Sequence, residues 1–402
     1  MFGKKKYIYL DHAATTPMDS KIAKKMSRIN QETYANAGGI HRMAVEAKEL
    51  VEDARARVAR QLSVLPTDIV FTRGGTESNV MGLWGVIASY RADNPGQIPH
   101  VLISTIEHAA VRESAWAWAD QGIITADEIP VGTNGVVDMN EFKSLLRPET
   151  ILVSIMYANN ETGSIQPIRD IAKVIRHWRK HNKTVYPYFH TDAVQGASYL
   201  DMNIPRLGVD LLSVTASKMY GPKGIGFLYI HPRLTVMPLM HGGSQEYDLR
   251  PGTPDTAGCV ACADAFDLAR DLVEKESKRL TLLKKETLLW LAESNIEYRI
   301  HGDVEETIPC TLNIGLPGAS GERFVIELDA TGFAVSSRAA CSSNADGESH
   351  ILTAMGYTDG WGSVRVSMGR STTSKDMKNF VQALVSVVAK IQKEREIINQ
   401  DS

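Results

Sequence analysis

The chain has 402 residues, 43% of them hydrophobic, which is enough for a large core and for two domains. Its formal net charge is −3, with both signs mixed along the sequence, so no whole-protein field favours nucleic acid or a membrane surface. The apolar runs are too short to cross a bilayer, and no secretory signal pattern is found at the start. Four cysteines do not suggest a disulfide framework in a chain of this length. We therefore expect a soluble, cytoplasmic protein.

Short apolar runs alternate with helical patterns through the first two thirds of the chain. Helical spacing predicts helices over 79–90 and 168–181. Six apolar runs predict strands: Ile69–Thr72, Val101–Ser104, Ile151–Ile155, Tyr188–Thr191, Leu211–Thr215 and Gly226–Ile230. This alternation is typical of an α/β architecture with a mostly parallel sheet covered on both faces.

The last third begins with the segment 261–294, where apolar residues at helical spacing predict one or two long helices. This segment leads to a second region with apolar runs at 310–316 and 324–328 and a final helix from Ser374. We predict a large domain and a smaller domain, with bounds 18–260 for the first and 1–17 together with 261–402 for the second.

The first of four loop motifs is Thr72-Arg73-Gly74-Gly75-Thr76-Glu77-Ser78, between a predicted strand and a predicted helix. Glycines let the backbone approach an anion, and free N–H groups at a helix start attract phosphate. Thr76 could add a hydroxyl donor. An ordinary glycine turn with a Thr or Ser cap stays open as the alternative.

The second motif is Asp192-Ala193-Val194-Gln195, directly after a predicted strand. A carboxylate at this place could pair with a protonated ring nitrogen and keep a pyridine cofactor cationic. Gln195, one helical turn further on, could hydrogen-bond a ring hydroxyl. Taken alone, the motif is better explained by an Asp helix cap followed by a solvated Gln.

The third motif is Thr215-Ala216-Ser217-Lys218-Met219-Tyr220-Gly221-Pro222, where a lysine follows an apolar run beside a rigid turn. Such a lysine can form a Schiff base if its surroundings lower its pKa. The spacing of the glycines and lysines does not match a Walker phosphate loop. A surface lysine beside a turn is the alternative.

The fourth motif surrounds Cys341, in Ser336-Ser337-Arg338-Ala339-Ala340-Cys341-Ser342-Ser343-Asn344. A lone cysteine usually packs in a core, but this one lies in a stretch rich in small and polar residues that predicts an exposed loop. An exposed thiol near a cation, here Arg338, is a candidate nucleophile.

Together these motifs resemble the cysteine desulfurases of the IscS/NifS type, which belong to the class-V aminotransferase-like enzymes that use pyridoxal 5'-phosphate (PLP). The similarity extends from Tyr9-Leu10-Asp11-His12-Ala13-Ala14-Thr15-Thr16-Pro17 to Val364-Arg365-Val366-Ser367-Met368-Gly369-Arg370, nearly the whole chain. It implies the PLP-dependent transferase fold of type I. In that fold a large domain with a mostly parallel mixed sheet is joined to a smaller C-terminal α+β domain, which here would carry the cysteine loop.

The resemblance also implies roles for the cofactor-binding residues. Lys218 is similar to the Schiff-base lysine, Asp192 to the partner of the pyridine nitrogen, and Gln195 to the residue that bonds the ring oxygen. His108, in Ile106-Glu107-His108-Ala109-Ala110, is similar to a histidine that stacks on the ring and takes part in proton transfer. Further positions match residues at the phosphate: Gly75, Thr76, Thr215, Ser217 and, reaching the other subunit of a homodimer, Thr253.

For the substrate, the resemblance implies that Asn160 and Arg365 hold the carboxylate of L-cysteine. An arginine suits this role because its planar fork can donate two hydrogen bonds to a carboxylate. The Cys341 thiolate would attack the substrate sulfur, which leaves alanine and a persulfide on Cys341. The sulfur would pass to an acceptor protein, a scaffold for iron–sulfur cluster assembly or a thiolation enzyme. No metal is expected.

Two positions depart from the pattern of the family. Ser217 stands where a histidine usually precedes the Schiff-base lysine, and it can donate to phosphate but lacks an imidazole. Arg338 stands where the cysteine loop usually has glycine. We expect these changes to affect rate and partner choice more than reaction type.

The other three cysteines are expected to be structural. Cys259 and Cys262 form a CxxC pair within alanine-rich helical sequence, and without a second pair we expect helix packing rather than a metal or redox site. Cys310 lies in an apolar strand pattern and is expected in the core.

Three alternatives to a desulfurase stay open. A selenocysteine lyase and another class-V PLP enzyme, such as an aminotransferase, would use the same fold. Cys341 argues against a transaminase, which has no need of it. A weakly active sulfur-relay scaffold is suggested by Ser217 and Arg338, while Lys218, Asp192 and Arg365 argue against it.

Overall fold

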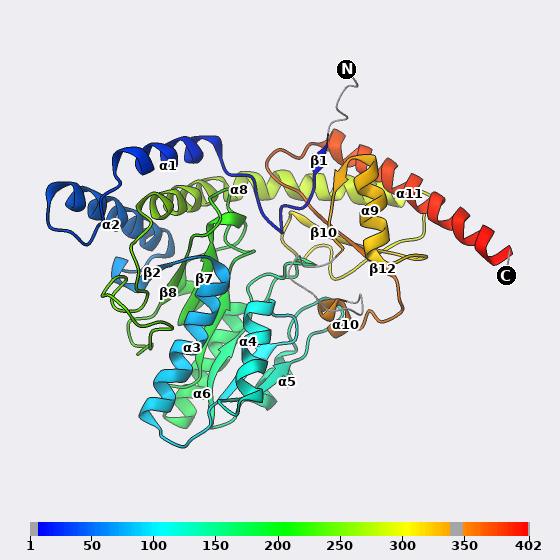
Figure 1. Ribbon diagram of the computed structural model, residues 1–402. Coiled ribbons are helices and arrows are strands. Elements are labelled where there is room, and N and C mark those ends of the chain that lie inside the picture. The colour runs from blue at the N-terminus through cyan, green and yellow to red at the C-terminus, as the bar shows by residue number, and fades with distance from the viewer. Residues whose placement is uncertain (1–6, 338–348, 401–402) are drawn as a thin grey trace.

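The computed structural model describes residues 7–337 and 349–400, and it places a large α/β unit beside a smaller unit (Figure 1). In the larger unit a seven-stranded sheet has the order β2-β8-β7-β6-β5-β3-β4. β8 runs antiparallel to both of its neighbours, and the other adjacent pairs are parallel. The strands are β2 Ile69–Thr72, β3 His100–Ser104, β4 Thr125–Ile129, β5 Thr150–Ser154, β6 Tyr188–Asp192, β7 Leu211–Thr215 and β8 Gly226–Ile230.

Helices cover both faces of this sheet. Val70 and Ile103 pack with residues of α3 and α4 on one face, whereas Phe71 and Leu102 pack with residues of α2, α6 and α8 on the other. Successive side chains of a strand point to opposite faces, so continuous apolar runs are what a sheet buried on both sides requires. The helices of this unit are α1 Ser20–Glu32, α2 Arg42–Leu62, α3 Gly75–Asp93, α4 Ala109–Asp120, α5 Met139–Leu145, α6 Ile168–Asn182 and α7 Ile204–Leu207, with 3₁₀ turns at Pro66–Asp68 and Ala216–Lys218.

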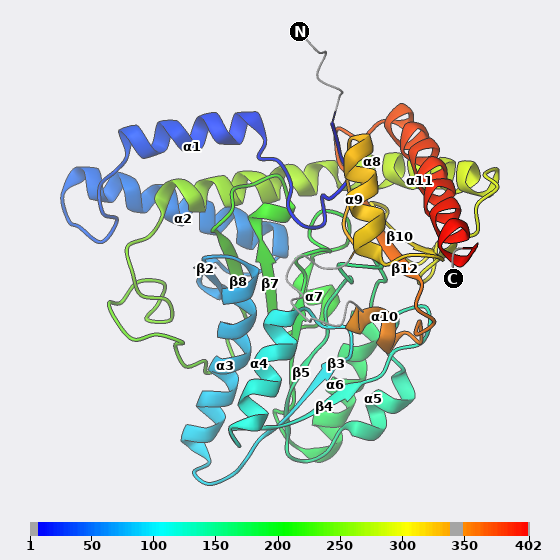
Figure 2. The same cartoon turned by 45° about the vertical axis from the view of Figure 1, so that its right-hand side comes forward.

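The smaller unit contains a three-stranded antiparallel sheet of order β12-β10-β9 and a short parallel pair of β1 with β11. Its core includes Leu312, Phe324 and Phe380, and it also takes in Leu10 from the N-terminal segment. That segment lies against the smaller unit in both views (Figure 2). The elements are β1 Ile8–Tyr9, β9 Arg299–Ile300, β10 Thr311–Leu316, α9 Gly321–Thr331, β11 Phe333–Ala334, α10 His350–Ala354, β12 Gly362–Ser367 and α11 Ser374–Gln400.

A single helix, α8 (Thr256–Ala292), connects the two units over 37 residues. Near its start, Ala265 and Phe266 are buried in the core of the seven-stranded sheet. Further along, Leu283 and Leu291 are buried in the core of the smaller unit. The helix therefore belongs to both cores, and the division of the chain at residues 17 and 260 stays a prediction.

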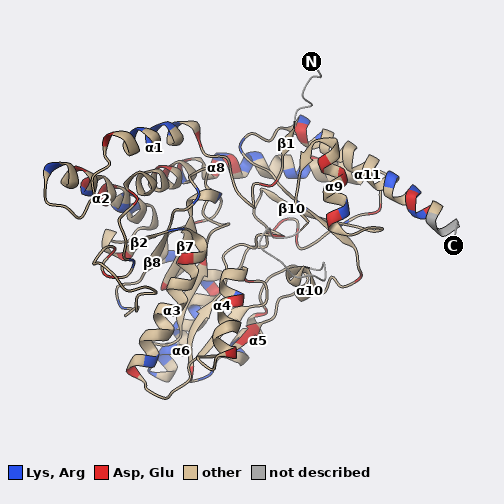
Figure 3. Cartoon of the chain, viewed as in Figure 1, with Lys and Arg blue, Asp and Glu red and all other residues tan. Residues whose placement is uncertain are grey.

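The elements predicted from the sequence are confirmed, whereas five strands were not predicted: β1, β4, β9, β11 and β12. All six predicted strands are present with bounds that agree to within one residue, and the segment 261–294 is one helix rather than two. β4 was missed because Thr125–Ile129 is polar and lies at the sheet edge, where one end of the strand is exposed. Acidic and basic residues are interspersed along the outer helices (Figure 3). Among the described helices, none combines the length and the apolar composition needed to cross a membrane.

Candidate active site

The candidate site lies where the parallel strands of the large sheet end. Because β8 is antiparallel to both β2 and β7, the carboxyl end of β2 lies at the same edge as the carboxyl ends of β3, β5, β6 and β7. The first three predicted loop motifs lie at the ends of β2, β6 and β7. Ligands of open α/β sheets bind at this edge.

The glycine-rich turn after β2 brings backbone close to β7 and β8. Gly74 has a φ of +138°, which favours glycine, and it forms the cap of α3. A Cβ atom on Gly226, the first residue of β8, would lie 2.4 Å from the Val214 carbonyl oxygen, so this strand also needs glycine. Thr76 stands in the first turn of α3, and the Oγ atoms of Thr215 and Ser217 lie 3.4 Å apart. The hydroxyls and helix N–H groups form a donor set suited to phosphate.

Asp192, the last residue of β6, is buried with 4% of its surface exposed. Its Oδ1 accepts a hydrogen bond from the Val194 backbone N–H at 2.9 Å, and its Oδ2 accepts one from Asn79 Nδ2 at 2.6 Å. Asn79, on α3, was not recognised from the sequence. Both donors are uncharged amides, so they orient this carboxylate without neutralising its charge.

Lys218 ends the 3₁₀ turn after β7, and its amine points to the N-terminal segment. Nζ donates to the Ala13 carbonyl oxygen at 2.7 Å and also to the Ala14 carbonyl oxygen. Gln195 Nε2 donates to the same Ala13 oxygen at 3.0 Å. The backbone of residues 13 and 14 thus forms one wall of the site, although alanines carry no chemical signal in the sequence.

His108 caps α4, since its Nδ1 accepts a hydrogen bond from the Ala110 backbone N–H at 3.0 Å. The preceding Glu107 is fully buried and accepts hydrogen bonds at Oε1 from Ser104 Oγ at 2.5 Å and from the Met156 N–H at 2.7 Å. Burial raises the pKa of the Glu107 carboxyl to about 8. At neutral pH this raised pKa favours the protonated form of the Glu107 carboxyl.

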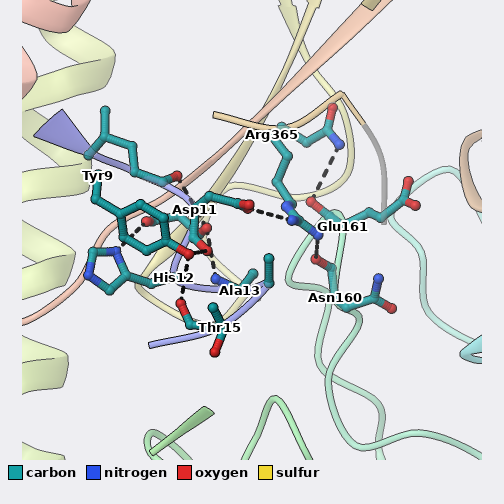
Figure 4. Close-up of polar contacts among 12 residues, drawn as sticks. Tyr9, Asp11, His12, Ala13, Thr15, Asn160, Glu161 and Arg365 are labelled. Atoms are coloured by element: carbon teal, nitrogen blue, oxygen red, sulfur yellow. Dashed lines mark hydrogen bonds and ion pairs between the residues drawn. The ribbon is translucent and has the colours of Figure 1, made fainter. Parts of the chain in front are cut away.

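Of the two predicted carboxylate-binding residues, Arg365 contacts both Asn160 and the N-terminal segment (Figure 4). Arg365 lies on β12 with 1% of its surface exposed, and its Nη1 donates to the Asn160 carbonyl oxygen at 3.0 Å. Its Nη2 forms an ion pair with Asp11 Oδ1 at 2.6 Å. Among the described residues, Arg365 Nε and Asn160 Oδ1 are buried without a hydrogen-bond partner. Asp11 was not recognised from the sequence as part of the site.

A cavity of about 210 Å³ brings together most of the predicted site residues. Lysine, carboxylate, imidazole, hydroxyl and guanidinium groups line it together: Gly75, Thr76, His108, Asn160, Asp192, Gln195, Thr215, Ser217, Lys218 and Arg365. It is also lined by Ala13, Ala14, Asn79, Met156 and Val194, which the sequence reading did not include.

Two predicted residues are not in this group. Thr253 is exposed and lines a separate hollow with Arg73 and Asp255. Its predicted role, reaching the phosphate of another subunit, stays a prediction. Cys341 and Arg338 lie outside the described residues, as does the rest of 338–348.

The cavity residues fit a pyridoxal phosphate group. A buried carboxylate held only by amide hydrogen bonds can stabilise a protonated pyridine nitrogen, and an amine lines the same cavity to meet an aldehyde. The hydroxyls at the start of α3 and after β7 provide donors for the phosphate. Three buried polar atoms without a partner in the described chain, on Asn79, Asn160 and Arg365, are further candidates for contacts with a bound molecule.

The remaining cysteines are structural, as expected. Cys259 and Cys262 are buried in α8 and Cys310 precedes β10, each with at most 4% of its surface exposed. Burial raises the pKa of all three thiols, which disfavours the reactive thiolate. Within residues 7–337 and 349–400 no group of three or more His, Cys, Asp or Glu is arranged to hold a metal ion.

Comparisons with known proteins agree with this geometry. The family model described as aminotransferase class-V matches residues 8–380. The cysteine desulfurase IscS of Dictyoglomus turgidum is 36% identical over 389 residues, covering 96% of both chains. The putative cysteine desulfurase IscS 1 of Bacillus subtilis is 34% identical over 387 residues, covering 96% of this chain and 99% of its own.

A solved structure of a NifS-like protein superimposes with a TM-score of 0.87 at 31% identity, covering 95% of this chain and 99% of its own. Family model, relatives and structure all span nearly the full length of the chain, so the likeness is not limited to one motif or one domain. The chain belongs to the aminotransferase class-V family, within its group of IscS/NifS-type cysteine desulfurases.

Proposed function

We propose that this protein is a PLP-dependent cysteine desulfurase, which converts L-cysteine to L-alanine and carries the released sulfur as a persulfide on Cys341. The observation that carries the proposal is the convergence of Lys218, Asp192 and Arg365 on one cavity. Their residue types supply an amine, a ring-nitrogen partner and a carboxylate clamp, which are the groups that amino-acid chemistry on a pyridine cofactor requires.

Pyridoxal phosphate, when bound, supplies an electron-withdrawing ring that stabilises negative charge at the substrate Cα. Lys218 would hold the aldehyde, Asp192 would pair with the ring nitrogen, and His108 would contact the ring. Thr76, Thr215 and Ser217 would hold the phosphate. Ser217 can donate one hydrogen bond but, unlike the family's usual histidine at this place, cannot carry a positive charge.

For the substrate, Arg365 and Asn160 would bind the carboxylate and fix the orientation of Cα. The Lys218 amine would move the proton at Cα. The Cys341 thiolate would attack the substrate Sγ, so that an S–S bond forms while the bond between Cβ and Sγ breaks. The acceptor of that sulfur would be another protein, a scaffold for iron–sulfur clusters or a thiolation enzyme. The cytoplasmic location expected from the sequence stays a prediction.

A homodimer is also part of the proposal. Thr253 is exposed and lines a different hollow from the main cavity, as a residue that reaches a partner's phosphate would. Tyr34 and Ile40, between α1 and α2, are 74% and 99% exposed, and large apolar side chains in such positions are often covered by a partner. Sedimentation should give twice the mass of one chain, and a monomer would contradict this part.

The experiment that tests the reaction uses purified protein with bound cofactor, L-cysteine and a thiol reductant. We expect sulfide and alanine in equal amounts. Cys341→Ala should keep the visible absorbance of the cofactor and lose sulfide release, and Lys218→Ala should lose the absorbance of the attached cofactor as well as sulfide release.

Other outcomes would identify the alternatives. Release of sulfide by Cys341→Ala at the rate of the unmodified protein would remove the proposed nucleophile. Selenide release from L-selenocysteine that persists without Cys341, together with no sulfide from L-cysteine, would favour a selenocysteine lyase. No sulfide from the unmodified protein in the presence of bound cofactor would favour a sulfur-relay scaffold.

A further inference from the structure

The ion pair between Asp11 and Arg365 lies beside the cavity and has no part in the reaction proposed so far (Figure 4). Arg365 contributes to the cavity wall, whereas Asp11 is not among the described lining residues. The Asp11 carboxylate pairs with Nη2 of the guanidinium, and Nη1 donates to the Asn160 carbonyl oxygen at 3.0 Å. The buried Nε is left without a partner in the described chain, so Arg365 is held by the protein at both Nη atoms and keeps hydrogen-bond capacity for a ligand.

The backbone of Asp11 is held by hydrogen bonds to the N-terminal segment and by pairing with β12. The Asp11 carbonyl oxygen accepts hydrogen bonds from Tyr9 Oη at 2.9 Å and from the Ala14 N–H at 3.1 Å. Asp11 also forms a parallel bridge with Ser367, two residues from Arg365 on β12. The same turn presents the Ala13 and Ala14 carbonyl oxygens to Lys218. The turn formed by residues 11–14 thus contacts both Lys218 and Arg365.

The pairing changes how strongly Arg365 attracts an anion. A guanidinium with 1% of its surface exposed retains a strong field, because little water screens it. Asp11, whose side chain is 20% exposed, cancels part of that field at a distance of 2.6 Å. A carboxylate entering the cavity is therefore attracted by a partly neutralised cation, and it is repelled by a second carboxylate nearby.

Resting on the proposed function, we propose that Asp11 is a positioning residue for substrate binding. It orients Arg365 through Nη2, and its negative charge weakens the hold of Arg365 on the carboxylate of the amino acid. Product alanine carries the same carboxylate as the substrate. Because Asp11 weakens the binding of a carboxylate by Arg365, the substrate can bind and the product can still dissociate.

The two contributions can be separated with two substitutions. Asp11→Asn keeps an oxygen that can accept from Nη2 but removes the charge, so L-alanine should bind roughly tenfold more tightly. Asp11→Ala removes the acceptor too, so Arg365 loses its anchor and binding should be weaker than in Asp11→Asn. Binding is measured by calorimetry on the protein with bound cofactor. Propionate, which lacks the amino group, is a second probe that reports on the carboxylate alone.

Asp19→Asn is the matched control. Asp19 belongs to the same N-terminal segment and caps α1 by accepting from the Lys21 N–H at 2.9 Å, a role that asparagine also fills. This control changes net charge equally and should leave the Kd for L-alanine within about twofold. In steady-state turnover Asp11→Asn should lower KM for L-cysteine and also lower kcat if alanine release becomes slow.

Three results would overturn the inference. Equal weakening of L-alanine binding by Asp11→Asn and Asp11→Ala would mean that the charge does not oppose the ligand and that the pair is only structural. Affinities in both variants that match Asp19→Asn would mean that Asp11 does not act on Arg365 at all. If Arg365→Ala binds L-alanine and propionate as tightly as the unmodified protein, the proposed carboxylate clamp itself fails, and the inference fails with it.

Discussion

The seven-stranded sheet and the three-stranded sheet contribute to the active site in different ways. The parallel strands of the large sheet end at one edge, and the residues at and just after these ends supply the amine, the imidazole, the hydroxyls and Asp192. The antiparallel sheet supplies Arg365 from the middle of β12, where it is paired with Asn313 of β10. The first arrangement gives motifs that are recognisable in sequence, because strand, glycine and polar residue follow one another. A lone arginine within a short buried strand gives no such pattern.

The large unit and the smaller unit each have a core of their own, and the largest expected effect tests whether the two cores unfold independently. Phe380 is fully buried in the core of the smaller unit and packs edge-to-face on Phe333 with ring centres 5.7 Å apart. Phe380→Ala should lower the free energy of unfolding by about 3–5 kcal/mol, measured by denaturant titration. Because α8 belongs to both cores, we expect one transition in which the absorbance of bound cofactor is lost together with helix. Two separate transitions would show that the units unfold independently.

On the large-sheet side, Asp192→Asn tests whether the buried carboxylate acts through its charge. The variant keeps an oxygen for the Asn79 amide and loses the negative charge that would hold a protonated ring nitrogen. Sulfide release should fall roughly a hundredfold, while bound cofactor is retained with altered absorbance. A rate within twofold of the unmodified protein would remove Asp192 from the proposed role.

Glu107, also in the large unit, is expected to make the stability of the protein depend on pH. Burial raises the pKa of its carboxyl to about 8, so the folded state holds this proton more tightly than the unfolded chain does. The contribution of Glu107 to stability is thus fully present below about pH 4.5 and is lost as the pH rises through about 8. Glu107→Gln should reduce the stability difference between pH 5 and pH 8.5 by up to about 4 kcal/mol, as measured by urea unfolding at both values. An unchanged difference would mean that the carboxyl is ionised in the folded protein.

Lys284, on α8 in the smaller unit, is expected to change stability with pH in the opposite direction to Glu107. It is 5% exposed and donates to Thr307 Oγ1 at 2.5 Å, and burial lowers the pKa of its amine to about 8. The unfolded chain therefore binds the proton more tightly, and stability should rise between about pH 8 and pH 10.5. Lys284→Met should raise the free energy of unfolding at pH 7 by about 1 kcal/mol and abolish that rise. Exposed Lys285 beside it, changed to Met, is the control that should do neither.

Much of the fold could be predicted because the buried strands are continuous apolar runs. β4 could not, since an edge strand with Asp127 and Glu128 has no apolar signature. The site was predicted in part. Asn79 and Asp11 were missed because each acts on another site residue, Asp192 or Arg365, from an element distant in the chain. Such pairings depend on which elements pack together, and a local motif does not contain that information.

Trapping the cofactor tests most directly whether the Lys218 amine is bonded to the cofactor aldehyde in this cavity. Borohydride reduction of the purified protein, followed by digestion and mass spectrometry, locates the lysine to which the cofactor is attached. We predict that fragment spectra place the pyridoxyl mass on Lys218 and not on nearby Lys223, without any need for turnover. Attachment at Lys223 or at another lysine, or a cofactor bound with no attachment at all, would contradict the account.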